Sequence, residues 1–97
     1  MRLSELQTLL KKLYLHKDLN RGINSTYIWL IEEIGELATL LNAQELEKTK
    51  ISEELADIIA WTISIANILN IDIEEAIVDK YPNKCIKCNS SPCNCVK

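Results

Sequence analysis

The sequence contains few residues that interrupt regular secondary structure. Its 97 residues include two glycines, two prolines and no phenylalanine. A sandwich or barrel of many strands needs a turn signal roughly every 8 to 12 residues, so this scarcity argues against an all-β fold. The hydrophobic share of 47% and the charged share of 26% exclude a disordered or collagen-like chain. We therefore expect one small all-α domain.

The chain also lacks an excess of positive charge and any long apolar run. Eleven basic residues stand against 14 acidic ones, which gives a net charge of −3. Broad electrostatic binding to nucleic acid or anionic lipid is therefore not expected, and a phosphate ligand needs a metal ion or a local basic group. No basic segment with a following apolar run resembles a secretion signal, and no uncharged stretch of about 18 residues could span a membrane. We expect a cytoplasmic protein.

Hydrophobic periodicity and capping signals predict three main helices and a short fourth. Asn24 or Ser25 is the expected N-cap of the second helix. Asp72 and Glu75 have the spacing of a capping box before the fourth helix, which Pro82 stops. The polar segment 43–50 is short enough to join antiparallel neighbours. The predicted helices run from residue 4 to the break at Gly22, and over 26–42, 52–69 and 73–79.

The composition changes after residue 82, so we expect an all-α domain at 1–82 and a cysteine-rich tail at 83–97. The tail holds all four cysteines and too few apolar side chains for a core. Four thiolates in this short segment can close around one structural Zn²⁺, although their spacing is not the usual pair of Cys-x-x-Cys motifs. Free thiols, disulfides and a disordered tail are the alternatives. The four residues are Cys85, Cys88, Cys93 and Cys95.

Four carboxylates fall on helix stripes that are otherwise apolar. At about 100° per residue, Glu33 and Glu36 share a stripe with apolar residues of the second helix. Glu54 and Asp57 do the same on the third helix. Burying an unpaired carboxylate costs on the order of several kcal/mol, so the cluster predicts a bound cation. All these ligands are oxygens and the lone His16 lies elsewhere, which favours Mg²⁺ or Mn²⁺.

The acidic stripes are mirrored about residue 45. In an antiparallel pair of helices, mirrored positions lie at the same height. We therefore predict that the members of each mirrored pair face one another across the two helices. The pairs are Trp29 with Trp61, Glu33 with Asp57, and Glu36 with Glu54.

Two acidic strings resemble a known family. The segments 32–36 (EEIGE) and 54–57 (ELAD) are similar to the Glu-Glu-x-x-Glu and Glu-x-x-Asp motifs of the all-α MazG-like nucleotide pyrophosphohydrolases. The likeness covers roughly residues 1–82. It implies Mg²⁺-dependent hydrolysis of nucleoside triphosphates to monophosphate and pyrophosphate, in house-cleaning of nucleotide pools. The residues that match the family's metal ligands are Glu33, Glu36, Glu54 and Asp57.

Other residues of the predicted site have weaker signals. Glu32 and Glu53 each adjoin a predicted ligand and are candidates to orient or deprotonate the attacking water, with plain surface charge as the alternative. The family places basic groups after the second motif, where Lys80 is the candidate to bind phosphate, with a plain surface lysine as the alternative. Trp29 and Trp61 are candidates to stack on a base, although core packing is the commoner role of such residues.

The third helix is apolar nearly all round, since Leu55, Ile59, Thr62 and Ile63 lie opposite its acidic stripe. We therefore expect a second subunit to complete the bundle. The resemblance likewise implies a homodimer or homotetramer. Two rival functions are a di-metal redox protein and a non-catalytic adaptor. A di-metal redox protein usually has a Glu-x-x-His motif that is missing here, and a non-catalytic adaptor with a zinc-binding tail leaves the embedded carboxylates unexplained.

Overall fold

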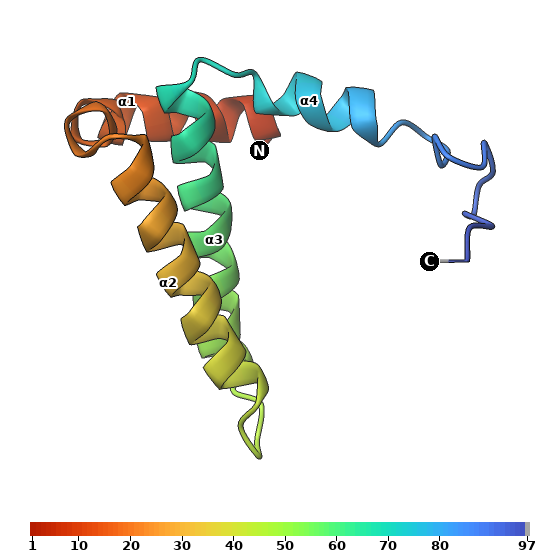
Figure 1. Ribbon diagram of the computed structural model, residues 1–97, viewed down its shortest axis with the longest axis horizontal. Coiled ribbons are helices and arrows are strands. Elements are labelled where there is room, and N and C mark those ends of the chain that lie inside the picture. Colours follow the sequence, from red (N-terminus) through yellow and green to blue (C-terminus); the bar gives the residue numbers. More distant parts are fainter. Residues whose placement is uncertain (97) are drawn as a thin grey trace.

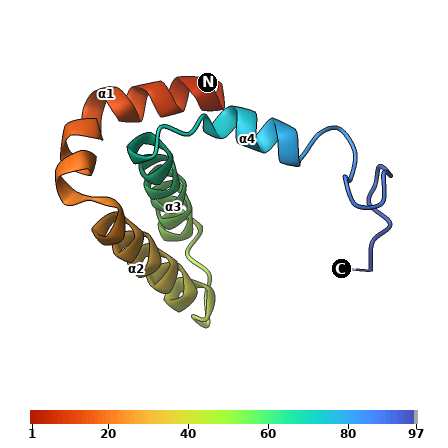
Figure 2. The same ribbon diagram turned by 45° about the horizontal axis from the view of Figure 1, so that its top comes forward.

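The computed structural model describes residues 1–96, which contain four helices and no strand. The second and third helices form an antiparallel hairpin, the first crosses one end of it, and the fourth leads away from it (Figures 1 and 2). The predicted all-α fold is confirmed. Among the residues described, no single helix is long and apolar enough to cross a membrane, and α3 and α4 meet that test only as a pair bent by 107°. The helices are α1 (Leu3–Arg21), α2 (Ile23–Leu41), α3 (Lys48–Ile68) and α4 (Ile73–Lys80).

A single glycine separates α1 from α2. Gly22 has φ 87°, a conformation that residues with a Cβ rarely adopt, and its carbonyl accepts a hydrogen bond from the Thr26 amide at 3.2 Å. The turn is therefore complete in one residue, and α2 starts at Ile23. The prediction that Asn24 or Ser25 caps this helix is wrong, because both lie inside its first turn and no side chain caps it.

The connection between α2 and α3 is shorter than the predicted 43–50. Helix α3 begins at Lys48, and the Glu47 carbonyl accepts from the Ile51 amide at 3.0 Å. Lys50 also pairs with Glu47 one turn earlier, at 3.0 Å. The three charged or polar residues at 48–50 therefore extend the helix instead of forming a loop.

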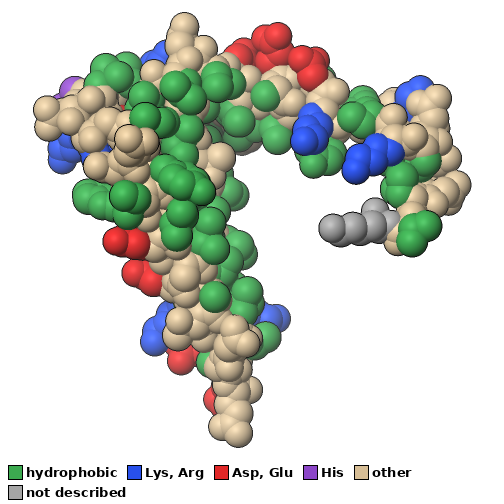
Figure 3. Space-filling view, in the orientation of Figure 1, with side chains coloured by type: hydrophobic (Ala, Val, Ile, Leu, Met, Phe, Trp, Pro, Cys, Tyr) green, Lys and Arg blue, Asp and Glu red, His purple; other side chains and the backbone are tan. Residues whose placement is uncertain are grey.

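The core is small and lies where α1 crosses α3. Its buried hydrophobic residues are Leu10, Ile63 and Ala66. Apolar side chains cover much of the visible surface of the α2–α3 hairpin (Figure 3). The radius of gyration is 16.0 Å, whereas a compact domain of about 100 residues has about 13 Å. The chain is thus extended, and many of its large apolar side chains are exposed, among them Ile34, Leu55 and Ile59.

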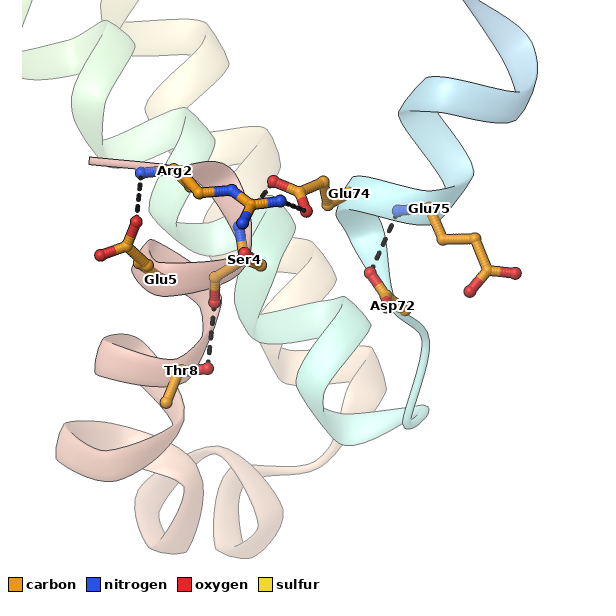
Figure 4. A network of polar contacts seen from close by, with 7 residues as sticks. All are labelled: Arg2, Ser4, Glu5, Thr8, Asp72, Glu74 and Glu75. Atoms are coloured by element: carbon orange, nitrogen blue, oxygen red, sulfur yellow. Dashed lines mark hydrogen bonds and ion pairs between the residues drawn. The ribbon is translucent and has the colours of Figure 1, made fainter.

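The turn from α3 into α4 contains Asn70 and Asp72. Asn70 has φ 56°, which Asn tolerates better than most residues, and the Ile71 amide donates to the Ala66 carbonyl at 2.8 Å. Asp72 then caps α4 by accepting from the Glu75 amide at 3.1 Å (Figure 4). Asp72 is confirmed as the N-cap, although the described contacts contain only this half of the predicted capping box. The predicted helix 73–79 is one residue too short.

Polar contacts fix α1 against the α3–α4 turn. The Gln7 side-chain amide donates to Asn67 Oδ1 at 3.0 Å and to the Ile71 carbonyl at 2.7 Å. Arg2 pairs with Glu74 at 3.3 Å, near the start of both helices (Figure 4). These bonds hold α1 across one end of the hairpin, away from its loop end (Figure 1).

Candidate functional site

Three carboxylates converge between α2 and α3. The side chains of Glu33, Glu36 and Glu54 each offer an oxygen, and these oxygens all lie within 4.8 Å of one another. Glu33 and Glu36 are three residues apart, so they are neighbours on one side of α2. Helix α3 runs antiparallel and brings Glu54 opposite them. The predicted juxtaposition of Glu36 with Glu54 is confirmed.

The three carboxylates repel one another. A hydrogen bond shared with Glu54, followed by the negative charge of Glu54, raises the pKa of Glu36 above its usual range. The pKa of Glu54 is raised first by a hydrogen bond with Glu33 and then by desolvation and the charge of Glu33. One carboxylate oxygen of Glu33 and one of Glu54 are buried without a hydrogen-bond partner. A divalent cation with hard oxygen ligands would satisfy these oxygens and remove the repulsion, so the residues present fit Mg²⁺ or Mn²⁺.

Asp57 lies next to this cluster without being one of the three. It is exposed and lines a hollow of about 330 Å³ between α1 and α3, together with Trp61. Its charge contributes to the raised pKa of both Glu36 and Glu54, which places it close to the cluster. That Glu33 faces Asp57, and that Asp57 is a ligand, stay predictions.

The two tryptophans lie on one layer, as the mirrored positions predict. The ring centroids of Trp29 and Trp61 are 5.2 Å apart, with an interplanar angle of 88°. The Arg21 guanidinium lies over both rings, 4.9 Å from one centroid and 4.8 Å from the other. Arg21 thus stacks on each ring, which supports a packing role for the two tryptophans. A role in stacking on a base stays a prediction.

A second hollow adjoins the carboxylates and contains a cation that the sequence analysis missed. It measures about 410 Å³, and Lys50 lines it beside Glu36, Glu53 and Glu54. The predicted connecting segment 43–50 includes Lys50, so the sequence pattern does not place this lysine on a helical face. Its spacing was the available signal, because Lys50 lies three residues before Glu53 and four before Glu54.

The comparison with protein families agrees with this geometry. The MazG nucleotide pyrophosphohydrolase domain matches residues 21–88. The chain belongs to the MazG family. The matched segment contains α2, α3 and α4, with every acidic residue of the candidate site, while nearly all of α1 precedes it. The comparison with curated proteins gives no match.

The remaining predicted residues of the MazG domain are exposed. Glu32 lies on the surface of α2, and its charge also raises the pKa of Glu36. Lys80 lies at the end of α4 and lines a hollow beside the tail, and it lines neither hollow next to the carboxylates. The role of Lys80 in binding phosphate stays a prediction. Lys50 lines the hollow beside Glu36 and Glu54, and Lys17 lines the hollow beside Asp57.

The cysteine tail forms a second cluster. The four sulfur atoms lie within 4.8 Å of one another, and the four residues have free thiols. Backbone amides of Asn94 and Ser90 lower the pKa of Cys88 to about 6. Lys97, the last residue of the predicted tail, lies outside the residues described. The tail leads away from the helix hairpin that holds the carboxylates (Figure 1).

Proposed function

We propose that this MazG domain is a nucleoside triphosphate pyrophosphohydrolase that requires Mg²⁺ or Mn²⁺. It cleaves the bond between the α and β phosphates and releases a nucleoside monophosphate and pyrophosphate. The observation that carries the proposal is the cluster of Glu33, Glu36 and Glu54, with two buried oxygens that lack a partner. Family membership supports the same reaction. A house-cleaning role in the cytoplasmic nucleotide pool follows from this activity.

The carboxylates would hold the divalent ion, with Asp57 as the fourth proposed ligand. When bound, the ion screens the phosphate charge, lowers the pKa of a coordinated water and stabilises the charge that develops during cleavage. Without it, this acidic site would repel a triphosphate.

Two residues at the edge of the cluster have proposed roles of their own. Lys50 lines the hollow beside Glu36 and Glu54, so its ammonium group can bind a phosphate oxygen there. Glu53 lines the same hollow, is exposed and adjoins a proposed ligand. It is our first candidate to accept the proton of the attacking water, and Glu32 on the opposite helix is the second.

A second copy of the chain is the proposed cover for the apolar surface of the hairpin. Alternating steps of four and three residues on α2 connect exposed apolar side chains, which is the spacing of a helix-packing seam. The chain exposes 7567 Å², whereas a folded monomer of 11.1 kDa exposes about 5,700 Å². This excess includes surface of the extended tail, and it is more than the roughly 800 Å² that each partner buries in a standard interface. The seam consists of Tyr27, Ile31, Ile34, Ala38 and Leu41.

The apolar face predicted on α3, opposite its acidic stripe, supports this interface only in part. Leu55 and Ile59 are 48% and 52% exposed, and Thr62 is exposed. The placement of Ile63 on that face is wrong, because Ile63 packs inside the chain and is 1% exposed. A homodimer or homotetramer is therefore proposed on the seam of α2 and on Leu55 and Ile59.

The decisive experiment measures the products released from a panel of ribonucleoside and deoxyribonucleoside triphosphates. We expect pyrophosphate and monophosphate in the presence of Mg²⁺ or Mn²⁺, and no release with chelator. A Glu36→Gln variant should lose this activity, and a Glu45→Gln variant in the connecting loop should keep it. Release of orthophosphate, or activity that survives chelation, would refute the proposal.

A further inference from the structure

The tail arranges four thiols at the spacing of a single metal ion's coordination sphere. Cys85 Sγ lies 3.8 Å from Cys95 Sγ, and Cys88 Sγ lies 3.9 Å from Cys93 Sγ. Zinc bound by sulfur is tetrahedral with a bond of about 2.3 Å, which puts neighbouring sulfurs about 3.8 Å apart. These two pairs thus already have the required separation. We propose that these four cysteines bind one Zn²⁺ in a closed structural site.

The backbone around the cysteines is folded to suit thiolate ligands. The Asn94 amide donates to Cys88 Sγ at 3.3 Å, and the Cys95 amide donates to Cys93 Sγ at 3.2 Å. Donors of this kind orient metal ligands and stabilise their negative charge. Both donating amides belong to the segment that brings Cys93 and Cys95 back to Cys85 and Cys88.

A tight turn brings the first two cysteines together. The Asn89 amide donates to the Cys85 carbonyl at 2.7 Å, and the Cys85 amide donates to the Ser90 carbonyl at 3.0 Å. Asn89 has φ 63°, in the left-handed region that Asn tolerates. The chain therefore closes a loop around Cys88 and presents its sulfur to the same point as that of Cys85.

The charge of the surrounding segment matches a tetrathiolate site. One Zn²⁺ with four thiolates has a net charge of −2. Residues 80–96 contain three lysines and no acidic residue, although the whole chain is acidic. Lys80, Lys84 and Lys87 line one hollow of about 600 Å³ together with Cys85 and Cys93. The excess negative charge of the site is thus offset locally.

The described part of the tail buries little apolar surface. Ile86 is 55% exposed and Val96 is fully exposed, so apolar burial does not hold the segment. Ordering a backbone costs about 1–2 kcal/mol per residue, which the few hydrogen bonds of the tail do not offset. Metal binding supplies folding energy in domains of this kind. The site lies apart from the three-carboxylate cluster, so the inference does not depend on the proposed hydrolysis.

Metal analysis of the full-length protein, purified without chelator, tests the inference. We expect about one zinc per chain, released by a thiol-directed mercurial. Replacement by Co²⁺ should give intense thiolate-to-cobalt absorption and the strong visible bands of tetrahedral Co²⁺. The double variant Cys88→Ser/Cys93→Ser should fall below about one-tenth of the wild-type zinc content. The control Ser90→Ala/Ser91→Ala should retain it.

Several results would overturn the inference. These are a purified protein without zinc that takes up no Zn²⁺ or Co²⁺ after reduction, iron in place of zinc, or a mass that shows two disulfides in protein kept under reducing conditions. Circular dichroism of the double variant separates loss of the ion from loss of the helical fold. The wild-type metal content needs no variant, so the inference stays falsifiable even if the variants do not fold.

Discussion

The Arg21 guanidinium donates a hydrogen bond at 3.0 Å to the carboxylate of Asp18, whose side chain is 1% exposed. The same guanidinium donates to the Thr26 hydroxyl at 3.0 Å and stacks on Trp29 and Trp61. One cation therefore joins the end of α1 to both helices of the hairpin. It lies at the tryptophan layer, directly beside the acidic cluster, so it anchors the end of α1 next to the site.

The first prediction concerns this buried ion pair. Arg21→Leu leaves the Asp18 carboxylate buried without its partner, which should lower the free energy of unfolding by about 3–5 kcal/mol. Urea denaturation at a fixed chain concentration measures the change. The matched control is Arg2→Leu, which breaks the exposed pair with Glu74 and should cost no more than about 1 kcal/mol. Equal losses in the two variants would contradict the role assigned to Arg21.

The register of the hairpin was predictable because it depends only on helix geometry. Trp29 and Trp61 meet because an antiparallel pair with equal rise brings mirrored positions to one height. The contacts of Arg21 with the tryptophans were not predictable in the same way, because the direction of its side chain depends on the one-residue turn at Gly22. Lys50 was missed for a related reason, since helix ends are the least certain part of a periodicity argument.

The tail shows a different limit of sequence reasoning. The cysteine count predicts a metal site, but the spacing leaves disulfides and free thiols open. The left-handed conformation of Asn89 and the hydrogen bonds from backbone amides to sulfur favour the metal site. The cysteine spacing reveals neither feature. The acidic segments of the hairpin are a stronger signal than the cysteines. The likeness to MazG proteins could be stated from the two short segments 32–36 and 54–57, because both occur in order on adjacent helices.

The second prediction concerns metal binding apart from catalysis. Glu36→Gln removes one of three mutually repelling carboxylates, so the metal-free variant should melt at a higher temperature than the metal-free wild type. Wild-type protein should gain about 2.7 kcal/mol when free Mg²⁺ is at about 100 times its Kd. The variant should lose most of this gain, whereas Glu45→Gln should behave as wild type. Differential scanning fluorimetry with and without Mg²⁺ measures both effects, and an unchanged response to Mg²⁺ in Glu36→Gln would argue against this site.

The third prediction follows from the raised pKa values of Glu36 and Glu54. Folding makes both groups harder to ionise, so the metal-free folded state binds more protons than the unfolded state near their titration range. Stability should therefore be fully present below the ordinary glutamate pKa and should decrease as the pH rises through the raised values. Denaturation of chelator-treated protein across the acidic range checks this slope. Saturating Mg²⁺ should flatten this dependence of stability on pH. A contribution of this site that rises with pH would contradict the assignment.

The fourth prediction tests the lysine that the sequence analysis missed. Lys50→Ala removes a cation from the hollow beside Glu36 and Glu53, so KM for the triphosphate should rise roughly 10- to 100-fold, with a smaller change in kcat. Stability should change little, because the pair of Lys50 with Glu47 is exposed. Steady-state kinetics of pyrophosphate release provides the measurement. Lys48→Ala, two residues earlier on α3, is the control and should leave KM unchanged.

The last prediction concerns the apolar seam of α2. Ile34 is 47% exposed at the middle of the seam, so Ile34→Glu places a charge where a second copy is proposed to pack. The carboxylate would remain solvated in a monomer but would be desolvated without a partner in the oligomer, which costs on the order of several kcal/mol. Light scattering coupled to gel filtration should show the wild type as a dimer or tetramer and the variant as smaller species at the same concentration. Leu19→Glu, at an exposed apolar position on α1 outside the seam, should keep the wild-type mass. A monomeric wild type, or an oligomer that tolerates Ile34→Glu, would exclude this face as the interface.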